Sequence, residues 1–347
     1  MHDVRPNYGF HPILEKDHPY IFIDACMQAW PDAEYHIAHR HGVTAYTVTS
    51  WMPHATLEQA VEGIMFWHLI ARKTPALLVA SRAEDIRRAK QEGKSVFILA
   101  AQDGDFIGNK LHRVEALYRL GLRILLPAYN TANIICSGCL DRTQSGLTSF
   151  GRLVVKEANR VGMVLDCSHL AKRSSLDIIE ESEKPVVFTH SNASAVVNNP
   201  RNIDDEQIKA CAGRGGVIGL ASWGPLVLKE NGSGWPTLDD FIDHVDHIAS
   251  LMGSTKHIGI GTDLSIGTYP DHARDPWGEP EYPNPSERYD KVVTSDIRSP
   301  KRALKDWNSY PEVVNFIEKL LVRRYSQQDV ANILGENFLR VFGEVWV

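Results

Sequence analysis

Short, continuous runs of apolar and β-branched residues recur along the chain, and stretches with helical periodicity separate them. Unbroken hydrophobicity of this kind is typical of strands that are buried on both faces, as in a parallel sheet. The runs predict eight strands, at residues 20–24, 44–49, 95–100, 123–128, 162–166, 185–189, 216–221 and 257–261. A further short run, Ala76–Ala80, is predicted to lie outside this set.

Apolar residues spaced three and four apart predict the helices between these strands. These helices cover residues 57–71, 83–91, 114–120, 150–161, 204–212 and 238–251, and two more close the chain at 310–322 and 326–342. Repeated alternation of strand and helix favours a (β/α)8 TIM barrel over an open sheet. No glycine-rich phosphate loop follows the first strand, which disfavours a dinucleotide-binding fold.

One catalytic barrel domain is predicted to span residues 1–347, because a barrel of this size is routinely a single domain. Residues 1–19 are expected to form an N-terminal extension. Residues 265–300, rich in proline, aspartate and aromatic residues, are expected to form a long loop after the eighth strand. Residues 310–347 carry the C-terminal helices.

Composition narrows the possible partners and location. The net charge is -6 and no basic stripe is present, so nucleic acid is not an expected partner. No apolar run approaches the roughly 18 residues of a membrane-spanning helix. The first residues do not resemble a secretory signal, and we expect a cytoplasmic protein. The five cysteines do not indicate a disulfide framework, and Cys136 and Cys139 lack a second pair for a zinc site.

Polar residues gather at the carboxyl ends of the predicted strands, where barrel enzymes carry their chemistry. His169 and His190 end consecutive strands, so both imidazoles can point into the same mouth as zinc ligands. The alternative is two core histidines that hydrogen-bond to the backbone. Asp263 follows the eighth strand, either as a metal ligand or general acid/base, or as a cap that accepts backbone N–H bonds. His244 and His247 are expected on a helix surface that faces away from the mouth, in a structural role.

Several segments, taken in order, resemble the membrane (renal) dipeptidase family, peptidase family M19. The resemblance runs from about residue 20 to the C-terminus and rests on Gly146–Arg152 with Glu157 and Asn159, Arg160–Met163, Asp166–His169, Pro185–Ala193, Pro200–Asn202, Asp246–Ile248, Gly259–Asp263 and Ile333–Phe342. It implies a metal-dependent hydrolase barrel with two zinc ions that hydrolyses the amide bond of dipeptides.

The resemblance also implies roles for individual residues. His169 and His190 would hold one zinc ion, and Asp263 would lie at the other and move the proton. Arg201 would bind the substrate carboxylate, a task that suits a planar guanidinium. Asn130 is expected to be a second substrate-binding residue.

The chain departs from the family pattern at the first metal. The family's first strand supplies a histidine and an aspartate, where this chain has Cys26 and Gln28. The bridging glutamate corresponds to Gln102, with Asp103 beside it as an alternative, and a histidine after the fourth strand corresponds to Tyr129. Two dications need carboxylates to offset their repulsion. The sequence therefore favours one zinc over two, leaves an empty site open, and makes Cys26 and Gln102 altered metal ligands.

Three functions remain open at this point. The first is a dipeptidase-like metallohydrolase that cleaves a dipeptide or an N-acyl amino compound, with Asp263 as acid/base and Tyr129 as a hydrogen-bond donor to the oxyanion. The second is a metal-free lyase or isomerase in the same mouth. The third is a non-catalytic homologue that binds a small molecule. A homodimer is the expected assembly.

Overall fold

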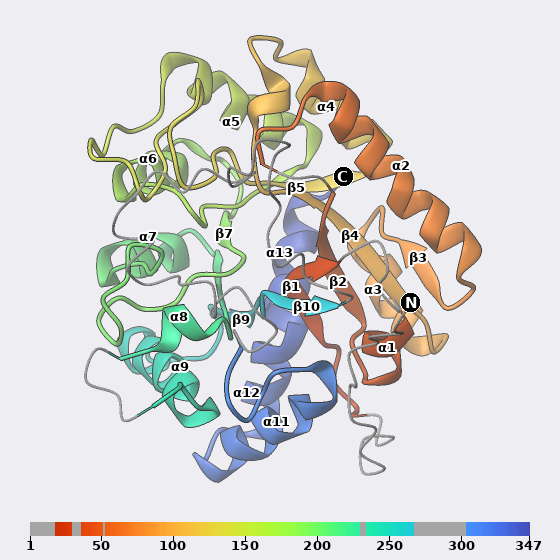
Figure 1. Ribbon diagram of the computed structural model, residues 1–347, viewed down its shortest axis with the longest axis vertical. Coiled ribbons are helices and arrows are strands. Elements are labelled where there is room, and N and C mark those ends of the chain that lie inside the picture. The colour runs from red at the N-terminus through yellow and green to blue at the C-terminus, as the bar shows by residue number, and fades with distance from the viewer. Residues whose placement is uncertain (1–17, 30–35, 51–52, 230–233, 267–302) are drawn as a thin grey trace, which may run out of the picture.

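Eight parallel strands close into a barrel in the computed structural model, which describes residues 18–29, 36–50, 53–229, 234–266 and 303–347 (Figure 1). Neighbouring strands follow the order β6-β5-β4-β2-β1-β9-β8-β7, and a bridge between Asp166 and Val187 joins the two ends. The strands are β1 Ile23–Ala29, β2 Ala45–Thr49, β4 Ser95–Ala101, β5 Leu122–Leu125, β6 Val164–Leu165, β7 Val187–Phe188, β8 Val217–Leu220 and β9 Ile258–Ile260. The predicted (β/α)8 barrel is confirmed.

Two short strands lie off this path. β3 (Leu77–Val79) pairs with the first residues of β4, outside the barrel as predicted. β10 (Leu264–Ile266) pairs with the end of β1, so the segment after the eighth strand begins as a strand and not as a loop. The rest of the predicted loop, from residue 267, lies outside the described residues, as do residues 1–17 of the predicted extension.

Strand β1 differs from its predicted bounds in a way that matters for the site. It begins at Ile23 and not at residue 20, and it continues to Ala29. Cys26 and Gln28 are therefore strand residues, not residues of a following loop. Strand geometry holds their backbone in place through the pairing with β2 and β10.

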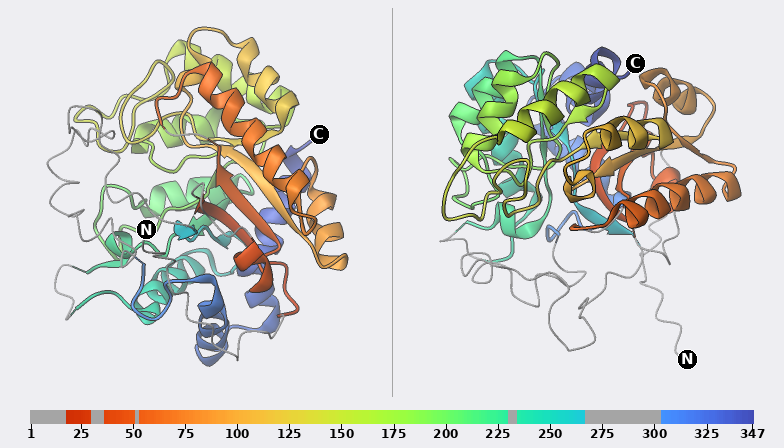
Figure 2. Two further views of the ribbon diagram at one scale, coloured as in Figure 1. Left: turned by 45° about the vertical axis from the view of Figure 1, so that its right-hand side comes forward. Right: turned by 90° about the horizontal axis from the view of Figure 1, so that it is seen from above.

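Helices surround the strands (Figure 2). They are α1 His36–Arg40, α2 Leu57–Lys73, α3 Ala83–Gln91, α4 His112–Leu120, α5 Ser149–Val161, α6 Lys172–Glu181, α7 Asp205–Gly213, α8 Gly224–Val227, α9 Leu238–Met252, α11 Val313–Val322, α12 Gln327–Ala331 and α13 Asn337–Val345. Capping boxes begin α2 at Thr56 and α9 at Thr237. Helix α6 is missing from the prediction because Ala171 gives it no side-chain cap and two serines weaken its pattern.

The core has two main parts. One lies between the outer faces of the strands and the helices around them. The other joins Ile23, Val96 and Val217 of the barrel strands to Phe338 and Phe342 of α13, and it extends to residues of α3. A Cβ on Gly259 would come within 2.3 Å of the Phe338 ring, so this glycine leaves room for the helix. Helix α13 thus fills the barrel from one end, and the polar strand ends are at the other.

Candidate active site

The two histidines predicted to bind zinc lie in direct contact. His169 follows β6 and His190 follows β7, and their Nε2 atoms are 2.8 Å apart. Both side chains are buried. Burial and the charge of Arg201 hold the pKa of both imidazoles well below its usual value, so both are neutral at neutral pH. Neutral imidazole is the form that binds metal.

Asn130 decides which nitrogen of His169 carries its hydrogen. The Asn130 Oδ1 atom lies 2.7 Å from His169 Nδ1, and a carbonyl oxygen can only accept. The thiol of Cys139, 3.5 Å away, donates to the same oxygen, which supports this orientation of the amide. His169 Nδ1 therefore donates, and its Nε2 atom presents a lone pair to His190. The lone pair on His169 Nε2 is buried and faces the second imidazole. This arrangement is suited to binding one metal ion between the two histidines.

The other half of the mouth does not fit a second ion. Gln28 Nε2 donates to Asp263 Oδ1 at 2.6 Å, and Gln102 Nε2 donates to Cys26 Sγ at 3.2 Å and to Thr49 Oγ1 at 2.9 Å. Amide N–H groups therefore point where metal ligands would be needed. Burial, then the charge of Asp263, raises the pKa of the Cys26 thiol well above its usual value, so the thiol is protonated in the metal-free protein.

Asp103 does not take part in this half. Its carboxylate accepts the backbone N–H groups of His54 and Asp105, and burial and the charge of Asp105 raise its pKa to about 6. His54 Nδ1 lies 2.8 Å from Asp105 Oδ2, so these three residues form a cluster of their own. Of the two residues considered for the bridging position, Gln102 is the one that contacts Cys26.

Arg201 is buried beside the histidine pair. Its Nη2 atom donates to the His190 carbonyl oxygen at 3.1 Å, and its Nη1 atom approaches Ser191 Oγ at 3.5 Å. Within the described ranges, no carboxylate forms an ion pair with it. Its charge helps to lower the pKa of both histidines and opposes the rise in the pKa of the Cys26 thiol.

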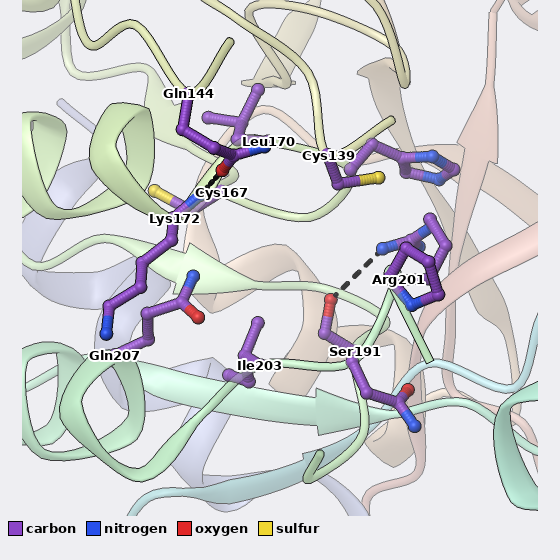
Figure 3. A pocket seen from close by; sticks show the side chains of 12 residues that line it. Cys139, Gln144, Cys167, Leu170, Lys172, Ser191, Arg201, Ile203 and Gln207 are labelled. Atoms are coloured by element: carbon purple, nitrogen blue, oxygen red, sulfur yellow. Dashed lines mark hydrogen bonds between the residues drawn. The ribbon is translucent and has the colours of Figure 1, made fainter. Parts of the chain in front are cut away.

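A pocket of about 90 Å³ opens next to Arg201 (Figure 3). Cys139 and Ser191 lie near the guanidinium, and Lys172 and Gln207 lie farther along the wall. Sequence reasoning missed Cys139 and Ser191, because a cysteine in a loop and a serine after a histidine carry no signal of their own. Tyr129 is not among the residues that line this pocket, and its ring stacks on that of His169 with the centroids 4.1 Å apart.

The barrel and its mouth define the class of protein, a (β/α)8 barrel of the metal-dependent hydrolase type. A family model described as membrane dipeptidase (peptidase family M19) matches residues 33–281, which is most of the chain. The chain therefore belongs to the membrane dipeptidase family.

Individual proteins similar to this chain include a dipeptidase, an uncharacterized protein and an amidohydrolase. Dipeptidase tcpJ of Claviceps purpurea is 26% identical over 84% of this chain, and the chain spans 61% of that protein's length. An uncharacterized protein of the pqqA 5' region in Klebsiella pneumoniae is 30% identical over 69% of this chain and 92% of its own length. The crystal structure of an amidohydrolase from Pseudomonas aeruginosa superposes with a TM-score of 0.82, at 29% identity, over 94% of this chain and 97% of that one.

Proposed function

We propose that this protein is a dipeptidase-like metallohydrolase that cleaves a small amide or peptide bond with a single zinc ion at His169 and His190. The observation that carries the proposal is Arg201, a buried guanidinium next to the histidine pair and without a carboxylate partner among the described residues. A buried cation needs an anion to offset its lost hydration. A substrate that ends in a carboxylate supplies that anion.

The pocket supports the same class of substrate. It begins at Arg201 and His169 and is small, at about 90 Å³. A dipeptide or an N-acyl amino acid would place its carboxylate on Arg201 and its scissile carbonyl near the histidines. The guanidinium can hold both carboxylate oxygens in parallel hydrogen bonds, which fixes the direction of the substrate.

The residues around the histidines have distinct tasks in this proposal. A zinc ion bound there would supply Lewis acidity toward the scissile carbonyl. Asp263 takes a proton from the attacking water and returns it to the leaving nitrogen as the C–N bond breaks. Gln28 orients the Asp263 carboxylate through its 2.6 Å hydrogen bond. The Tyr129 hydroxyl donates to the carbonyl oxygen as negative charge develops on it.

The test combines metal analysis with a pair of substrates that differ only in the charge of the C-terminus. We expect about one equivalent of zinc in the purified protein, and hydrolysis of dipeptides or acyl amino acids that stops on chelation. R201M should lower kcat/KM about 100-fold on a free carboxylate, because two charge-assisted hydrogen bonds contribute about 3 kcal/mol. The same change should have little effect on a C-terminally amidated substrate.

R173M is the control, because Arg173 is largely exposed and pairs with Asp177 outside the mouth. Failure to cleave any member of a broad panel with added zinc, manganese or cobalt would overturn the proposal. Turnover that survives chelation would favour the metal-free lyase or isomerase instead.

The finer expectations remain predictions. These are zinc as the metal, a cytoplasmic location, a homodimeric assembly and a single catalytic domain over residues 1–347. In the described part of the chain, no helix combines the length and apolar character needed to cross a bilayer.

A further inference from the structure

Asp166, at the end of β6, is a fully buried carboxylate with no role in the proposed reaction. Its Oδ1 atom accepts the backbone N–H groups of Ser168 and Thr189, both at 2.9 Å. Its other oxygen, Oδ2, accepts the hydroxyl of Thr189. The two oxygens therefore have separate functions, because Oδ1 accepts backbone N–H groups and Oδ2 accepts a side-chain hydroxyl.

Asp24, in β1, repeats this arrangement, and we call each aspartate with its threonine a clamp. The Asp24 Oδ1 atom accepts the N–H groups of Cys26 at 3.2 Å and Thr262 at 2.8 Å, and its Oδ2 atom accepts the Thr262 hydroxyl at 2.6 Å. Oδ2 also accepts the hydroxyl of Tyr310 at 2.6 Å. The two clamps differ in what else the threonine hydroxyl contacts. Among the described residues, the Thr189 hydroxyl also contacts an imidazole, and the Thr262 hydroxyl does not.

The Thr189 hydroxyl connects Asp166 to His190. Thr189 Oγ1 lies 2.7 Å from His190 Nδ1. A hydroxyl has one hydrogen, and Thr189 gives it to a carboxylate, which can only accept. The Thr189 oxygen must then accept from His190 Nδ1. His190 carries its hydrogen on Nδ1, and its Nε2 lone pair points at His169, as the lone pair of His169 points back.

We propose that Asp166 is a positioning residue that acts through Thr189 to keep the hydrogen of His190 on Nδ1. The inference rests on the proposed function, since it concerns the same histidine pair. With the hydroxyl reversed, His190 Nε2 would carry a hydrogen aimed at His169 Nε2. The two imidazoles would then hydrogen-bond to each other, and an ion could bind between them only after the hydrogen moved back to Nδ1. Partners of this kind set the tautomer of metal-binding histidines in general.

The substitution Asp166→Asn isolates this effect. An asparagine can keep its oxygen on the two backbone N–H groups and place its NH2 group where Oδ2 lies. The NH2 group donates to Thr189, which turns the hydroxyl toward His190 Nδ1. T189V removes the hydroxyl, and T189S retains it as the conservative rescue. D24N makes the same chemical change in the matched clamp, where the threonine contacts no imidazole.

Two measurements report on the proposal. Titration with Zn²⁺ or Co²⁺ should show binding about 10- to 100-fold weaker in D166N and T189V, with T189S and D24N close to wild type. Histidine ¹⁵N chemical shifts of the metal-free proteins should show a protonated Nδ1 on His190 in wild type and T189S. In D166N the same atom should be unprotonated.

The second measurement separates this inference from the proposed function. If wild type binds no metal, the single-metal proposal fails, and the shifts still decide whether Asp166 sets the tautomer. An unprotonated His190 Nδ1 in wild type would overturn the inference. So would a protonated Nδ1 in folded D166N, or a loss of metal affinity in D24N as large as in D166N.

Discussion

Three residues of the mouth have backbone conformations that residues other than glycine rarely adopt. The φ angles are 61° at Asn130, 61° at His169 and 56° at Asp263. Each costs on the order of 1–3 kcal/mol and persists only where the surrounding structure enforces it. Each also directs a side chain toward the histidine pair or toward Cys26. Two further described residues, His54 and Arg324, share this conformation, so three of the five such non-glycine residues belong to the mouth.

His244 is a buried histidine whose burial makes the stability of the fold depend on pH. The sequence places it on a helix surface that faces away from the mouth, in a structural role, and α9 buries this side chain at 0% exposure. Its Nδ1 atom accepts the Ala193 N–H group at 3.2 Å, and its Nε2 atom has no hydrogen-bond partner among the described residues. Burial lowers the pKa of His244 to about 3. The folded protein therefore holds this histidine neutral where the unfolded chain would protonate it.

We expect H244Q to reduce the acid sensitivity of the fold. Below the usual histidine pKa of about 6.5, His244 is protonated in the unfolded chain. In the folded protein it stays neutral down to about pH 3. Stability contributed by the neutral form is thus complete above pH 6.5 and is lost as the pH falls. The slope of unfolding free energy with pH should be smaller in the variant by about 1.4 kcal/mol per unit between pH 6 and 4. Equal slopes in urea titrations would contradict this.

The closing helix shows why element boundaries are harder to predict than elements. Its pattern predicts one helix over 326–342, but a π-helical turn, Asn332–Glu336, separates α12 from α13. At this turn Gly335 approaches the start of β1 so closely that a Cβ would lie 2.5 Å from the Ile21 carbonyl oxygen. Asn337 donates to the carbonyl oxygens of Thr255 and Ile258, at 2.7 and 2.8 Å. The barrel wall, which no local pattern encodes, shapes the helix.

G335A should destabilise the protein by about 1–3 kcal/mol, because the backbone next to β1 cannot yield as a flexible side chain could. G343A is the control. Its Cβ would meet nothing closer than Ala83 Cβ at 3.9 Å, and alanine is the better helix former, so stability should be unchanged or slightly higher. Chemical denaturation of both variants provides the comparison, and equal effects would refute the steric explanation.

Among the elements, sequence reasoning located all eight barrel strands, because buried parallel strands are unbroken apolar runs. It missed β10, which is only three residues long, and α6, which has no capping signal. In the site it selected His169 and His190 from their place at strand ends. It gave Asp166 and Thr189 no role, because the direction of a hydrogen bond depends on coordinates and not on residue spacing.

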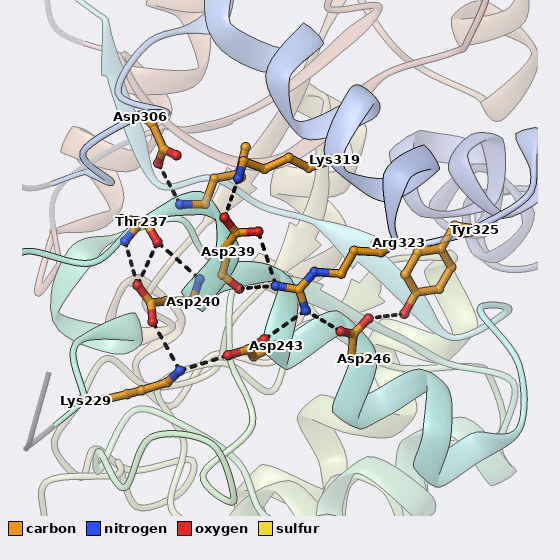
Figure 4. A network of polar contacts seen from close by, with 11 residues as sticks. Lys229, Thr237, Asp239, Asp240, Asp243, Asp246, Asp306, Lys319, Arg323 and Tyr325 are labelled. Carbon is orange, nitrogen blue, oxygen red and sulfur yellow. Dashed lines mark hydrogen bonds and ion pairs between the residues drawn. The ribbon is translucent and has the colours of Figure 1, made fainter.

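At the scale of the whole molecule, a charged network fastens the C-terminal segment to the barrel (Figure 4). Arg323, just after α11, contacts Asp239, Asp243 and Asp246 of α9. Tyr325 donates to Asp246 at 2.7 Å. The same segment carries Tyr310, which reaches Asp24, so surface charges help to hold a residue next to the mouth.

We expect R323M to lower stability by about 1–2 kcal/mol, because one guanidinium offsets several neighbouring carboxylates and their repulsion remains when it is lost. The loss should shrink in 1 M salt, where these charges are screened. R119M removes an exposed pair with Glu115 on a single helix and should cost under about 0.5 kcal/mol. A larger loss in the control, or no salt dependence, would refute the network explanation.

The two aspartate–threonine clamps lie where strand pairing is weakest. β6 and β7 share one bridge, Asp166 with Val187, and β9 pairs with β1 only through Asp24 and Ile260 before β10 resumes the ladder. The barrel thus consists of two arcs, β1 to β6 and β7 to β9, and the two clamps reinforce the few backbone bonds that join them. His169 and His190 stand on opposite arcs, as do Cys26 and Asp263. A shift of one arc relative to the other would change the His169–His190 and Cys26–Asp263 distances together. The geometry of the site therefore depends on the alignment of the two arcs.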